Sequence, residues 1–332
     1  KGKGAVYAEN DKDGIYHGVN KFDKNTGEVI KETEFTSWSK EYADKLYGLM
    51  RDNEKYFTIC PATGLGSELT KIAKEFPERY ADVGINEEHG IVFSAGLSLS
   101  GFHPFISVYS TFLQRCYDEI SHDLARMNLN ATLLIDRSGL VGSDGDTHQG
   151  IYDASFLYTI PNCVITMASK PSQIDSLLEE STKNHGVFAI RYPKDKLSMA
   201  QTKEIQKIEF GGWNELRTGN NIALVSYGPI IHDLLFEVEN RKIDVTIYEA
   251  VYTRPILNKN VESLKDYSKI VIYDPYSTEV GFANSLTSEL YKQGYKGEII
   301  IKAIPNSFIS HGTIDEQRNE LGISIDKIID IL

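Results

Sequence analysis

An acid, a hydroxyl and an imidazole stand close together in one glycine-bracketed run of this chain, Ser143-Asp-Gly-Asp-Thr-His-Gln-Gly150. The run is too polar for a core segment, and it follows residues 131–137, whose sequence Ala-Thr-Leu-Leu-Ile-Asp-Arg is typical of a buried strand. Open α/β sheets bind their ligands at the carboxyl ends of strands. Arg137, Asp144 and His148 therefore belong to one candidate site.

A glutamate, Glu87, marks a second position with chemical potential, because strand-like residues 80–85 give way there to a helical pattern. Its carboxylate could simply complement the dipole at the start of that helix. However, the next strand-like segment ends at Tyr109, and the helical pattern after it contains Phe112 and Arg115. One sheet edge would then gather an acid, aromatic rings, guanidinium groups and a histidine.

Alternating strand and helix patterns must position these side chains. In the first half of the chain we expect strands at residues 56–60, 80–85, 104–109, 131–137, 163–167 and 187–192. We expect helices at about residues 37–53, 87–100, 112–127 and 172–183. Regular alternation of this kind is typical of a parallel sheet covered by helices.

The second half repeats this organisation after a polar, charged stretch at residues 194–209, which we take as the domain boundary. Strands are expected at residues 221–226, 245–248, 269–273 and 298–302, and helices at about 230–240, 259–267 and 279–293. The predicted fold class is therefore α/β with two domains. Residues 1–35 contain many turn formers and little hydrophobic periodicity, which indicates a linker, and we expect further sequence before it.

Composition excludes several classes of function. The 332 residues are 41% hydrophobic and 25% charged, as in ordinary globular proteins, and suffice for two domains. The formal net charge of −12 argues against a nucleic-acid or anionic-membrane partner, although a local basic pocket for a phosphate remains possible. Cys60, Cys116 and Cys163 lack CxxC spacing, so no disulfide framework or zinc site is expected, and a reducing cytoplasm fits best. No apolar run approaches the roughly 20 residues of a membrane span.

Several longer motifs of the chain can be compared with known families. They are KGKG at 1–4, YHGVNKFD at 16–23, the run 82–150 that begins DVGINEEHG and ends GSDGDTHQG, IRYPK at 190–194 and IPNSFISHGT at 304–313. Together they resemble the 1-deoxy-D-xylulose-5-phosphate synthases, thiamine-diphosphate enzymes of the transketolase superfamily. Transketolases themselves look more like EDGPTHQP at the loop, so the loop favours the synthases.

The resemblance implies two three-layer α/β/α domains. Residues 36–196 would form a transketolase-like pyrimidine-binding domain and residues 208–332 a transketolase C-terminal-like domain, with 1–35 as an interdomain linker. In this family the domain that binds the diphosphate and Mg²⁺ lies upstream, and its Gly-Asp-Gly…Asn signature is not found in the sequence. We therefore expect the metal ligands in an N-terminal domain on the same or a separate chain, and no activity from this chain alone.

On the cofactor side, the resemblance assigns roles to five residues. Glu87 matches the glutamate that drives the aminopyrimidine ring of thiamine diphosphate towards its imino tautomer, which makes the amino group of the ring basic. Phe112 matches the aromatic residue that stacks on that ring, and the less favoured alternative is a core residue at a helix start. Arg115 matches an active-site arginine, and Lys1 and His17 match residues that reach the cofactor from the interdomain segment.

On the substrate side, the resemblance assigns roles to five more residues. Tyr109 matches an active-site tyrosine, and Arg137 and Lys194 match the ligands of the acceptor phosphate. Asp144 and His148 match residues that hold and protonate the substrate-derived groups, and imidazole is suited to proton transfer near neutral pH. A lone loop histidine is more often an ordinary surface residue, and the matched motif favours the functional interpretation here.

The chain departs from the family pattern at several positions. Lys194 replaces an arginine whose planar fork would hold phosphate with two bonds, so weaker acceptor binding is expected. Asp146 replaces a frequent proline, and Glu88 a frequent glutamine. Residues 61–66, 251–257 and 273–282 also diverge, which bears on dimer contacts. Four histidines outside the motifs are expected at the surface or in helices: His103, His122, His185 and His232.

Three hypotheses about function remain. The first is the C-terminal part of a homodimeric, cytoplasmic synthase that joins pyruvate and glyceraldehyde 3-phosphate with loss of carbon dioxide, for isoprenoid-precursor, thiamine and pyridoxal biosynthesis. The second is the C-terminal subunit of a split transketolase-like enzyme. The third is a non-catalytic homologue that acts as a binding partner.

Overall fold

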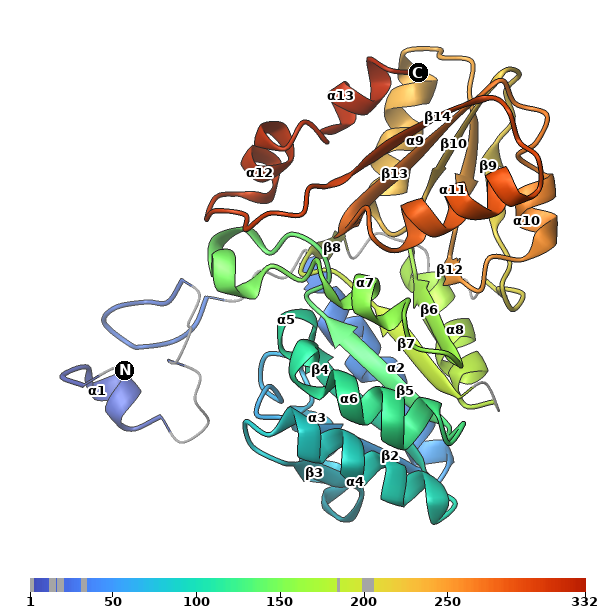
Figure 1. The fold of residues 1–332 in the computed structure, drawn as a ribbon. Coiled ribbons are helices and arrows are strands. Elements are labelled where there is room, and N and C mark those ends of the chain that lie inside the picture. The colour runs from blue at the N-terminus through green and yellow to red at the C-terminus, as the bar shows by residue number, and fades with distance from the viewer. Residues whose placement is uncertain (1–2, 12–15, 17–20, 31–34, 184–185, 199–205) are drawn as a thin grey trace.

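The computed structural model describes residues 3–11, 16, 21–30, 35–183, 186–198 and 206–332. These residues form two α/β domains, each built on its own sheet (Figure 1). A short antiparallel pair, β1 (Phe35–Ser37) with β8 (Lys196–Ser198), joins the start of the first domain to the segment that leaves it. The predicted α/β fold class is confirmed.

The first sheet has seven strands in the order β12-β6-β7-β5-β4-β2-β3. Their bounds are β2 (Tyr56–Cys60), β3 (Tyr80–Asp82), β4 (His103–Tyr109), β5 (Ala131–Asp136), β6 (Cys163–Met167), β7 (Val187–Arg191) and β12 (Tyr252–Arg254). All neighbouring pairs are parallel except β12 with β6. The central strands β5, β6 and β7 are buried along their whole length, as expected for a parallel sheet with helices on both faces.

The edge strand β12 comes from the second half of the chain, and the sequence patterns did not predict it. Tyr252 is fully buried in a core of the first domain. Arg254 fixes the strand further, because its Nη1 donates to the carbonyl oxygens of Leu157, Tyr158 and Ile160 over 3.0, 3.1 and 2.8 Å. The second half of the chain therefore completes the first sheet.

Helices cover both faces of this sheet. One face packs against α2 (Trp38–Asp52), α3 (Thr70–Glu75) and α8 (Ile174–Ser181), and the other against α4 (Glu87–Leu99), α7 (Asp153–Leu157) and the helical residues 110–125. Ser37 caps α2, since its side chain accepts a hydrogen bond from Lys40 N. Each face therefore buries a separate apolar core.

The continuous helix predicted at residues 112–127 is wrong. The structure has α5 (Ser110–Leu113), a 3-10 turn (Gln114–Cys116), α6 (Tyr117–Glu119) and a π-helical turn (Ile120–Ala125). The backbone leaves helical geometry at Cys116, which has φ −112° and ψ 27°. Such local changes of helical pitch are frequent at functional sites, and this one follows directly after Phe112 and Arg115.

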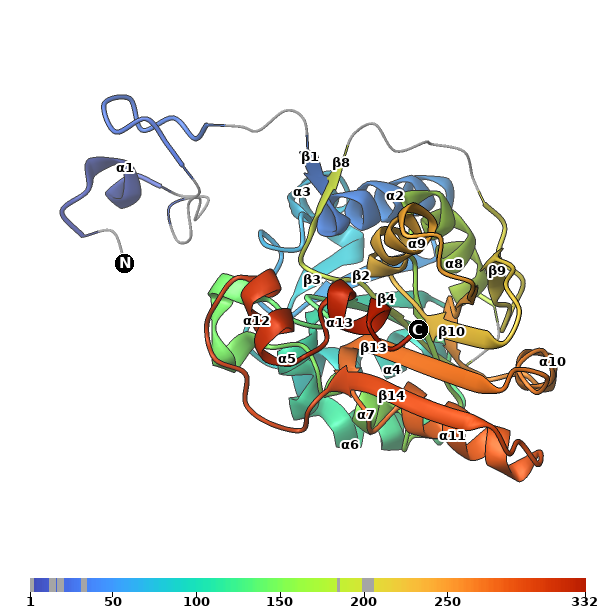
Figure 2. The ribbon, with the colours of Figure 1, turned by 90° about the horizontal axis from the view of Figure 1, so that it is seen from above.

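The second sheet has the order β14-β13-β10-β11-β9, in which only the edge strand β9 is antiparallel. The strands are β9 (Asn214–Arg217), β10 (Ile222–Ser226), β11 (Thr246–Glu249), β13 (Lys269–Thr278) and β14 (Glu298–Ile304). The helices are α9 (Ile230–Asn240), α10 (Asn258–Glu262), α11 (Phe282–Lys292), α12 (Ile314–Glu320) and α13 (Ile325–Ile329). Figure 2 shows α9 and α11 on opposite faces of the sheet.

The described part of the N-terminal segment contains the short helix α1 (Val6–Glu9) and a bridge between Phe22 and Val29. Both views place it beside the two domains rather than within either core (Figures 1 and 2). Across the described residues, no helix has the length and apolar character required to cross a membrane.

Two of the histidines expected at the surface or in helices are buried to different extents. His103 begins β4 and shares a 2.7 Å hydrogen bond between its Nε2 and Thr132 Oγ1, so the surface or helical placement is wrong. Burial lowers its pKa to about 4, because a charged imidazole would be poorly solvated there. His232 does lie in a helix, α9, and its Nε2 is 2.8 Å from Ser169 Oγ of the first domain.

Candidate functional site

The candidate site lies at the carboxyl ends of adjacent parallel strands of the first sheet. Tyr109 ends β4, Arg137 directly follows β5, and Lys194 comes three residues after the end of β7. Because these strands neighbour one another in the sheet, the segments that follow them meet at one edge. The placement expected from the sequence is therefore the one observed.

An aromatic group occupies the centre of this edge. The rings of Tyr109 and Phe112 stack, with centroids 5.7 Å apart and 15° between their planes. Phe112 also meets the imidazole of His148 edge to face, at 5.7 Å and 73°. The Nδ1 atom of His148 is 2.9 Å from Thr147 Oγ1, which fixes one side of the imidazole ring. The ring predicted to stack on a cofactor thus contacts the predicted proton donor.

A cluster of charges continues from the aromatic group. The guanidinium of Arg137 lies 3.7 Å from the centroid of the Tyr109 ring. Its Nε atom is 3.9 Å from Asp144 Oδ2, and Lys194 Nζ donates to Asp144 Oδ1 over 2.5 Å. Contacts therefore run without a break from Phe112 and His148 to the two cations predicted to hold a phosphate.

Buried groups hold this cluster in place. Asp136 is fully buried, and its Oδ2 accepts hydrogen bonds from Ser39 Oγ at 2.8 Å and Arg137 Nη1 at 2.9 Å. Burial raises the pKa of Asp136, while the neighbouring guanidinium opposes that rise. Burial likewise raises the pKa of Tyr109, so its hydroxyl stays protonated at neutral pH. The signal for Asp136 was present in the sequence as the last residue of the strand.

Glu87 lies at the first turn of α4, following Asn86. Only 3% of its side chain is exposed, and Arg115 Nη1 donates to its Oε2 over 3.2 Å. Half of the Arg115 side chain is exposed, so one end of this pair faces outward. Arg115 follows Phe112 by three residues, within the distorted helical segment, which links the acid to the aromatic group.

Lys1 and His17, which the resemblance placed near the cofactor, lie outside the described residues. The other eight predicted site residues are described, and they form two sets. Six are joined in one series of contacts, namely Tyr109, Phe112, Arg137, Asp144, His148 and Lys194. Glu87 and Arg115 form a pair of their own.

Two positions that the sequence analysis missed shape the site. A Cβ atom at Gly66 would lie 1.9 Å from Tyr109 Oη and 3.1 Å from Arg137 Nη2, so only glycine leaves room for the tyrosine. Gln149 is buried, with its Oε1 accepting from Val141 N at 3.0 Å and its Nε2 donating to Ile309 O at 3.5 Å. Gly66 is visible in the sequence only as a divergent glycine-rich run, and Gln149 only as a polar neighbour of His148.

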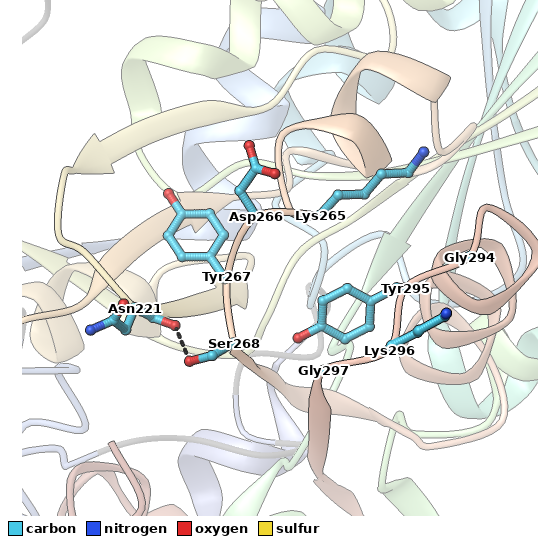
Figure 3. Close-up of a pocket in the computed structure, with 9 residues that line it drawn as sticks. All are labelled: Asn221, Lys265, Asp266, Tyr267, Ser268, Gly294, Tyr295, Lys296 and Gly297. Carbon is cyan, nitrogen blue, oxygen red and sulfur yellow. Dashed lines mark hydrogen bonds between the residues drawn. The ribbon is translucent and has the colours of Figure 1, made fainter.

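A hollow of about 470 Å³ lies elsewhere, in the second domain. Figure 3 shows residues 265–268 and 294–297 around it, with Ser268 Oγ donating to Asn221 O over 3.0 Å. Residues 265–268 precede β13, residues 294–297 precede β14, and Asn221 precedes β10. The hollow therefore lies at the amino ends of these strands. It is therefore separate from the charged and aromatic cluster, which lies at carboxyl ends.

Two known protein families match these two domains. Residues 35–199 match the family described as transketolase, pyrimidine binding domain, and residues 211–328 match transketolase, C-terminal domain. The chain carries the pyrimidine-binding and C-terminal domains of the transketolase family. The cluster at the strand ends thus belongs to a pyrimidine-binding domain.

Similar proteins are found among the 1-deoxy-D-xylulose-5-phosphate synthases. The chain is 36% identical to the synthase of Geobacillus sp. over 338 residues, which cover 99% of this chain and 54% of the relative. It is 35% identical to the synthase of Exiguobacterium sibiricum over 328 residues, covering 97% and 52%. The chain thus spans about half the length of the curated relatives it matches.

Solved structures share the fold at lower identity. A split gene transketolase, described as an inactive beta4 tetramer, superposes with a TM-score of 0.77 at 20% identity over 89% of this chain and 96% of its own. A transketolase from Campylobacter jejuni gives 0.74 at 16% identity, covering 90% and 47%. The transketolase-like fold of both domains is therefore confirmed.

The family relationship implies dependence on thiamine diphosphate, and the residues present fit its aminopyrimidine ring. Glu87 offers a nearly buried carboxylate, and Phe112 offers an aromatic face within reach of Tyr109 and His148. The residues do not fit a metal ion in the same way. Among the described residues, no group of three or more His, Cys, Asp or Glu side chains is placed to hold one.

Proposed function

We propose that this chain supplies the pyrimidine-binding and acceptor-binding side of a 1-deoxy-D-xylulose-5-phosphate synthase. The reaction would join pyruvate and glyceraldehyde 3-phosphate into 1-deoxy-D-xylulose 5-phosphate with release of carbon dioxide, for isoprenoid-precursor, thiamine and pyridoxal biosynthesis. The observation that carries the proposal is the unbroken series of contacts from Phe112 through Tyr109 and Arg137 to Asp144 and Lys194. A purely structural protein has no need to gather those side chains at one edge.

Glu87 and Phe112 would hold the pyrimidine ring. The cofactor, once bound, would supply the electron-sink chemistry that decarboxylation of pyruvate requires. The nearly buried carboxyl group of Glu87 would hydrogen-bond to a ring nitrogen, and its low exposure keeps competing water away from that bond. Phe112 would orient the ring through its face, and Arg115 would hold the glutamate side chain in place through its hydrogen bond to Oε2.

Arg137 and Lys194 would bind the phosphate of the acceptor. In the structure both cations face Asp144, so the phosphate would share them with this carboxylate. His148, held by Thr147 and packed on Phe112, would donate a proton to the substrate-derived oxygen. Asp144 would hold an acceptor hydroxyl, which places the acceptor between the aromatic ring and the cations.

The remaining parts of such an enzyme would lie outside the described residues. We propose that Mg²⁺ and the diphosphate are held by an N-terminal domain, on the same chain or on a partner, and that the enzyme works as a homodimer in the cytoplasm. Lys1 and His17 would reach the cofactor from the segment between the domains. The relatives are about twice the length of this chain, in keeping with such an additional domain.

One observation favours a second candidate, the C-terminal subunit of a split transketolase-like enzyme. The split gene transketolase chain is matched over 96% of its length, so it has nearly the same extent as the chain described here. Under this proposal the acceptor is another sugar phosphate, and the same two cations would bind its phosphate group. A non-catalytic binding partner is the third outcome.

The test is an assay of the whole protein as its gene encodes it, together with any partner chain. Pyruvate, glyceraldehyde 3-phosphate, thiamine diphosphate and Mg²⁺ are supplied, and 1-deoxy-D-xylulose 5-phosphate is measured by mass spectrometry. Formation of 1-deoxy-D-xylulose 5-phosphate from pyruvate supports the synthase. A parallel assay replaces pyruvate with a ketose phosphate donor, and sugar-phosphate product from that donor alone supports the split transketolase. If neither donor gives a product, the non-catalytic partner is supported.

Glu87→Gln and Glu88→Gln form a matched pair for this assay. Both change a glutamate in the first turn of α4, but Glu87 is buried beside Arg115 whereas Glu88 is only half-buried. We expect Glu87→Gln to lower kcat by about 100-fold or more, the range of a lost proton-transfer group, and Glu88→Gln to stay within about twofold. Equal rates for the two variants would contradict the role of Glu87.

A further inference from the structure

The 139–150 loop, which carries the acid and the imidazole of the site, is closed at its base by two backbone hydrogen bonds. Gly139 N donates to Gly150 O over 2.6 Å, and Gly150 N donates to Gly139 O over 2.8 Å. Gly139 has a φ of +91°, and a Cβ atom there would lie 2.8 Å from Cδ1 of Tyr276 in β13. The base of the loop is therefore packed directly on the second domain.

Arg191, the last residue of β7, is almost completely buried beside this base. Its Nε and Nη2 atoms donate to the two carboxylate oxygens of Asp153 over 2.7 and 2.9 Å. Nη2 also donates to Tyr276 O over 2.8 Å and to Gly150 O over 3.4 Å. One planar guanidinium thus joins the end of the loop, the start of α7 and the second domain.

The same ion pair reaches the aromatic part of the site. Ser110 Oγ donates to Asp153 Oδ1 over 2.7 Å, and Ser110 is the first residue of α5, which carries Phe112. A Cβ atom at Gly150 would lie 2.8 Å from both Cβ and Oγ of Ser110, so the loop end is in close contact with the helix start. Movement of the loop would therefore disturb the helix that bears the ring.

We propose that Arg191 is a positioning residue, which fixes the 139–150 loop relative to Phe112 by binding the loop end, Asp153 and the backbone of Tyr276 at once. The catalytic part of this proposal rests on the proposed function. Through Arg191, the second domain sets the distance between the acceptor-binding loop and the ring that contacts the cofactor. A lysine at this position keeps the charge but loses the planar fork, which also donates to Tyr227 Oη over 3.4 Å and so reaches four partners.

The alternative is that this buried ion pair only holds the two domains together. Arg254 provides a matched control, because it is also an arginine at the contact between the domains and also donates to several backbone carbonyl oxygens. It contacts Leu157, Tyr158 and Ile160 and makes no hydrogen bond to the 139–150 loop among the described residues. Arg191→Lys and Arg254→Lys therefore separate loop positioning from domain attachment.

The experiment measures amide hydrogen exchange and steady-state kinetics of the whole protein. We expect Arg191→Lys to speed exchange of the Gly139 and Gly150 amides by on the order of tenfold, with exchange in the second domain unchanged. The KM for glyceraldehyde 3-phosphate should rise about tenfold while the KM for pyruvate stays within about twofold, because the misplaced loop serves the acceptor. Arg254→Lys should leave both the loop amides and the acceptor KM unchanged.

Equal exchange changes in the two lysine variants, spread over both domains, would overturn the proposal. If Arg191→Lys does not fold, Ser110→Ala decides, since it removes one hydroxyl that binds Asp153 and touches the loop end. Faster exchange at Gly150 in that variant supports the proposal, and unchanged exchange overturns it. A protein that forms no product but shows the expected exchange pattern refutes the proposed function and leaves the structural role of Arg191 intact.

Discussion

The charge state of Asp274 should make the stability of this protein fall as pH rises. Asp274 is fully buried in β13, where its Oδ1 accepts from Tyr227 Oη at 2.5 Å and from Tyr276 N at 3.3 Å. Its Oδ2 has no hydrogen-bond partner among the described residues, and the nearby cation Arg191 is already bound to Asp153. Burial accordingly raises the pKa of Asp274 from 3.8 to about 7, against the opposing effects of Tyr227 and Arg191.

The sign and size of the effect follow from that shift. Above its ordinary pKa the unfolded chain has released this proton, while the folded protein keeps it until about pH 7, so folding becomes less favourable as pH rises between the two values. Each pKa unit corresponds to about 1.4 kcal/mol, and about two units lie between pH 5 and the folded pKa. Asp274 should therefore lower the free energy of unfolding by about 3 kcal/mol from pH 5 to about pH 8.

Asp274→Asn isolates this contribution, because the amide has the same shape and does not titrate. The free energy of unfolding is measured by urea denaturation for the wild type and the variant across this pH range, and the difference between them is plotted. We expect the difference to move in favour of the variant by about 3 kcal/mol. Asp244→Asn, at an exposed position of the same domain, serves as the control and should give a flat difference. A flat difference for Asp274→Asn as well would refute the reasoning.

Three further changes test the site itself. Gly66→Ala should raise the KM for glyceraldehyde 3-phosphate about tenfold, because the new methyl group takes the place of Tyr109 Oη; an unchanged KM would show that the tyrosine is dispensable. Lys194→Arg should lower the same KM several-fold, because a second hydrogen bond to the phosphate would strengthen acceptor binding by about 1 kcal/mol. A higher KM would contradict the assigned phosphate contact. Phe112→Ala should weaken thiamine diphosphate binding about two- to tenfold in a fluorescence titration, and unaltered affinity would place the ring outside the cofactor site.

The sequence allowed much of the fold to be predicted where the signal is local. The strand at residues 163–167 and the helix at 230–240 were predicted with their observed bounds, since apolar runs and helical periodicity depend on neighbouring residues. The meeting of Tyr109, Arg137 and Lys194 was predictable for a related reason. Parallel strands bring the residues that follow them to one edge, whatever the details of packing.

Features that depend on distant residues were not predictable in this way. The strand β12 forms because residues 252–254 pair with the edge strand β6, which lies more than 80 positions before them in the sequence. The helix breaks at Cys116, a residue buried in the core beneath it, and the helical periodicity of residues 112–127 carries no sign of this break. Gln149 bonds to Ile309, a partner 160 positions away, so its role could not be deduced from the loop alone.

These distant contacts change how the divergent residues 273–282 are understood. From the sequence, their departure from the family pattern predicts altered dimer contacts. In the structure, Tyr276 packs on Gly139 and binds Arg191 through its carbonyl oxygen, while Asp274 binds Tyr227 in the same buried network. A substitution in this segment therefore acts on the base of the 139–150 loop. Its effect on the KM for the acceptor should be measured before any effect on dimer assembly is inferred.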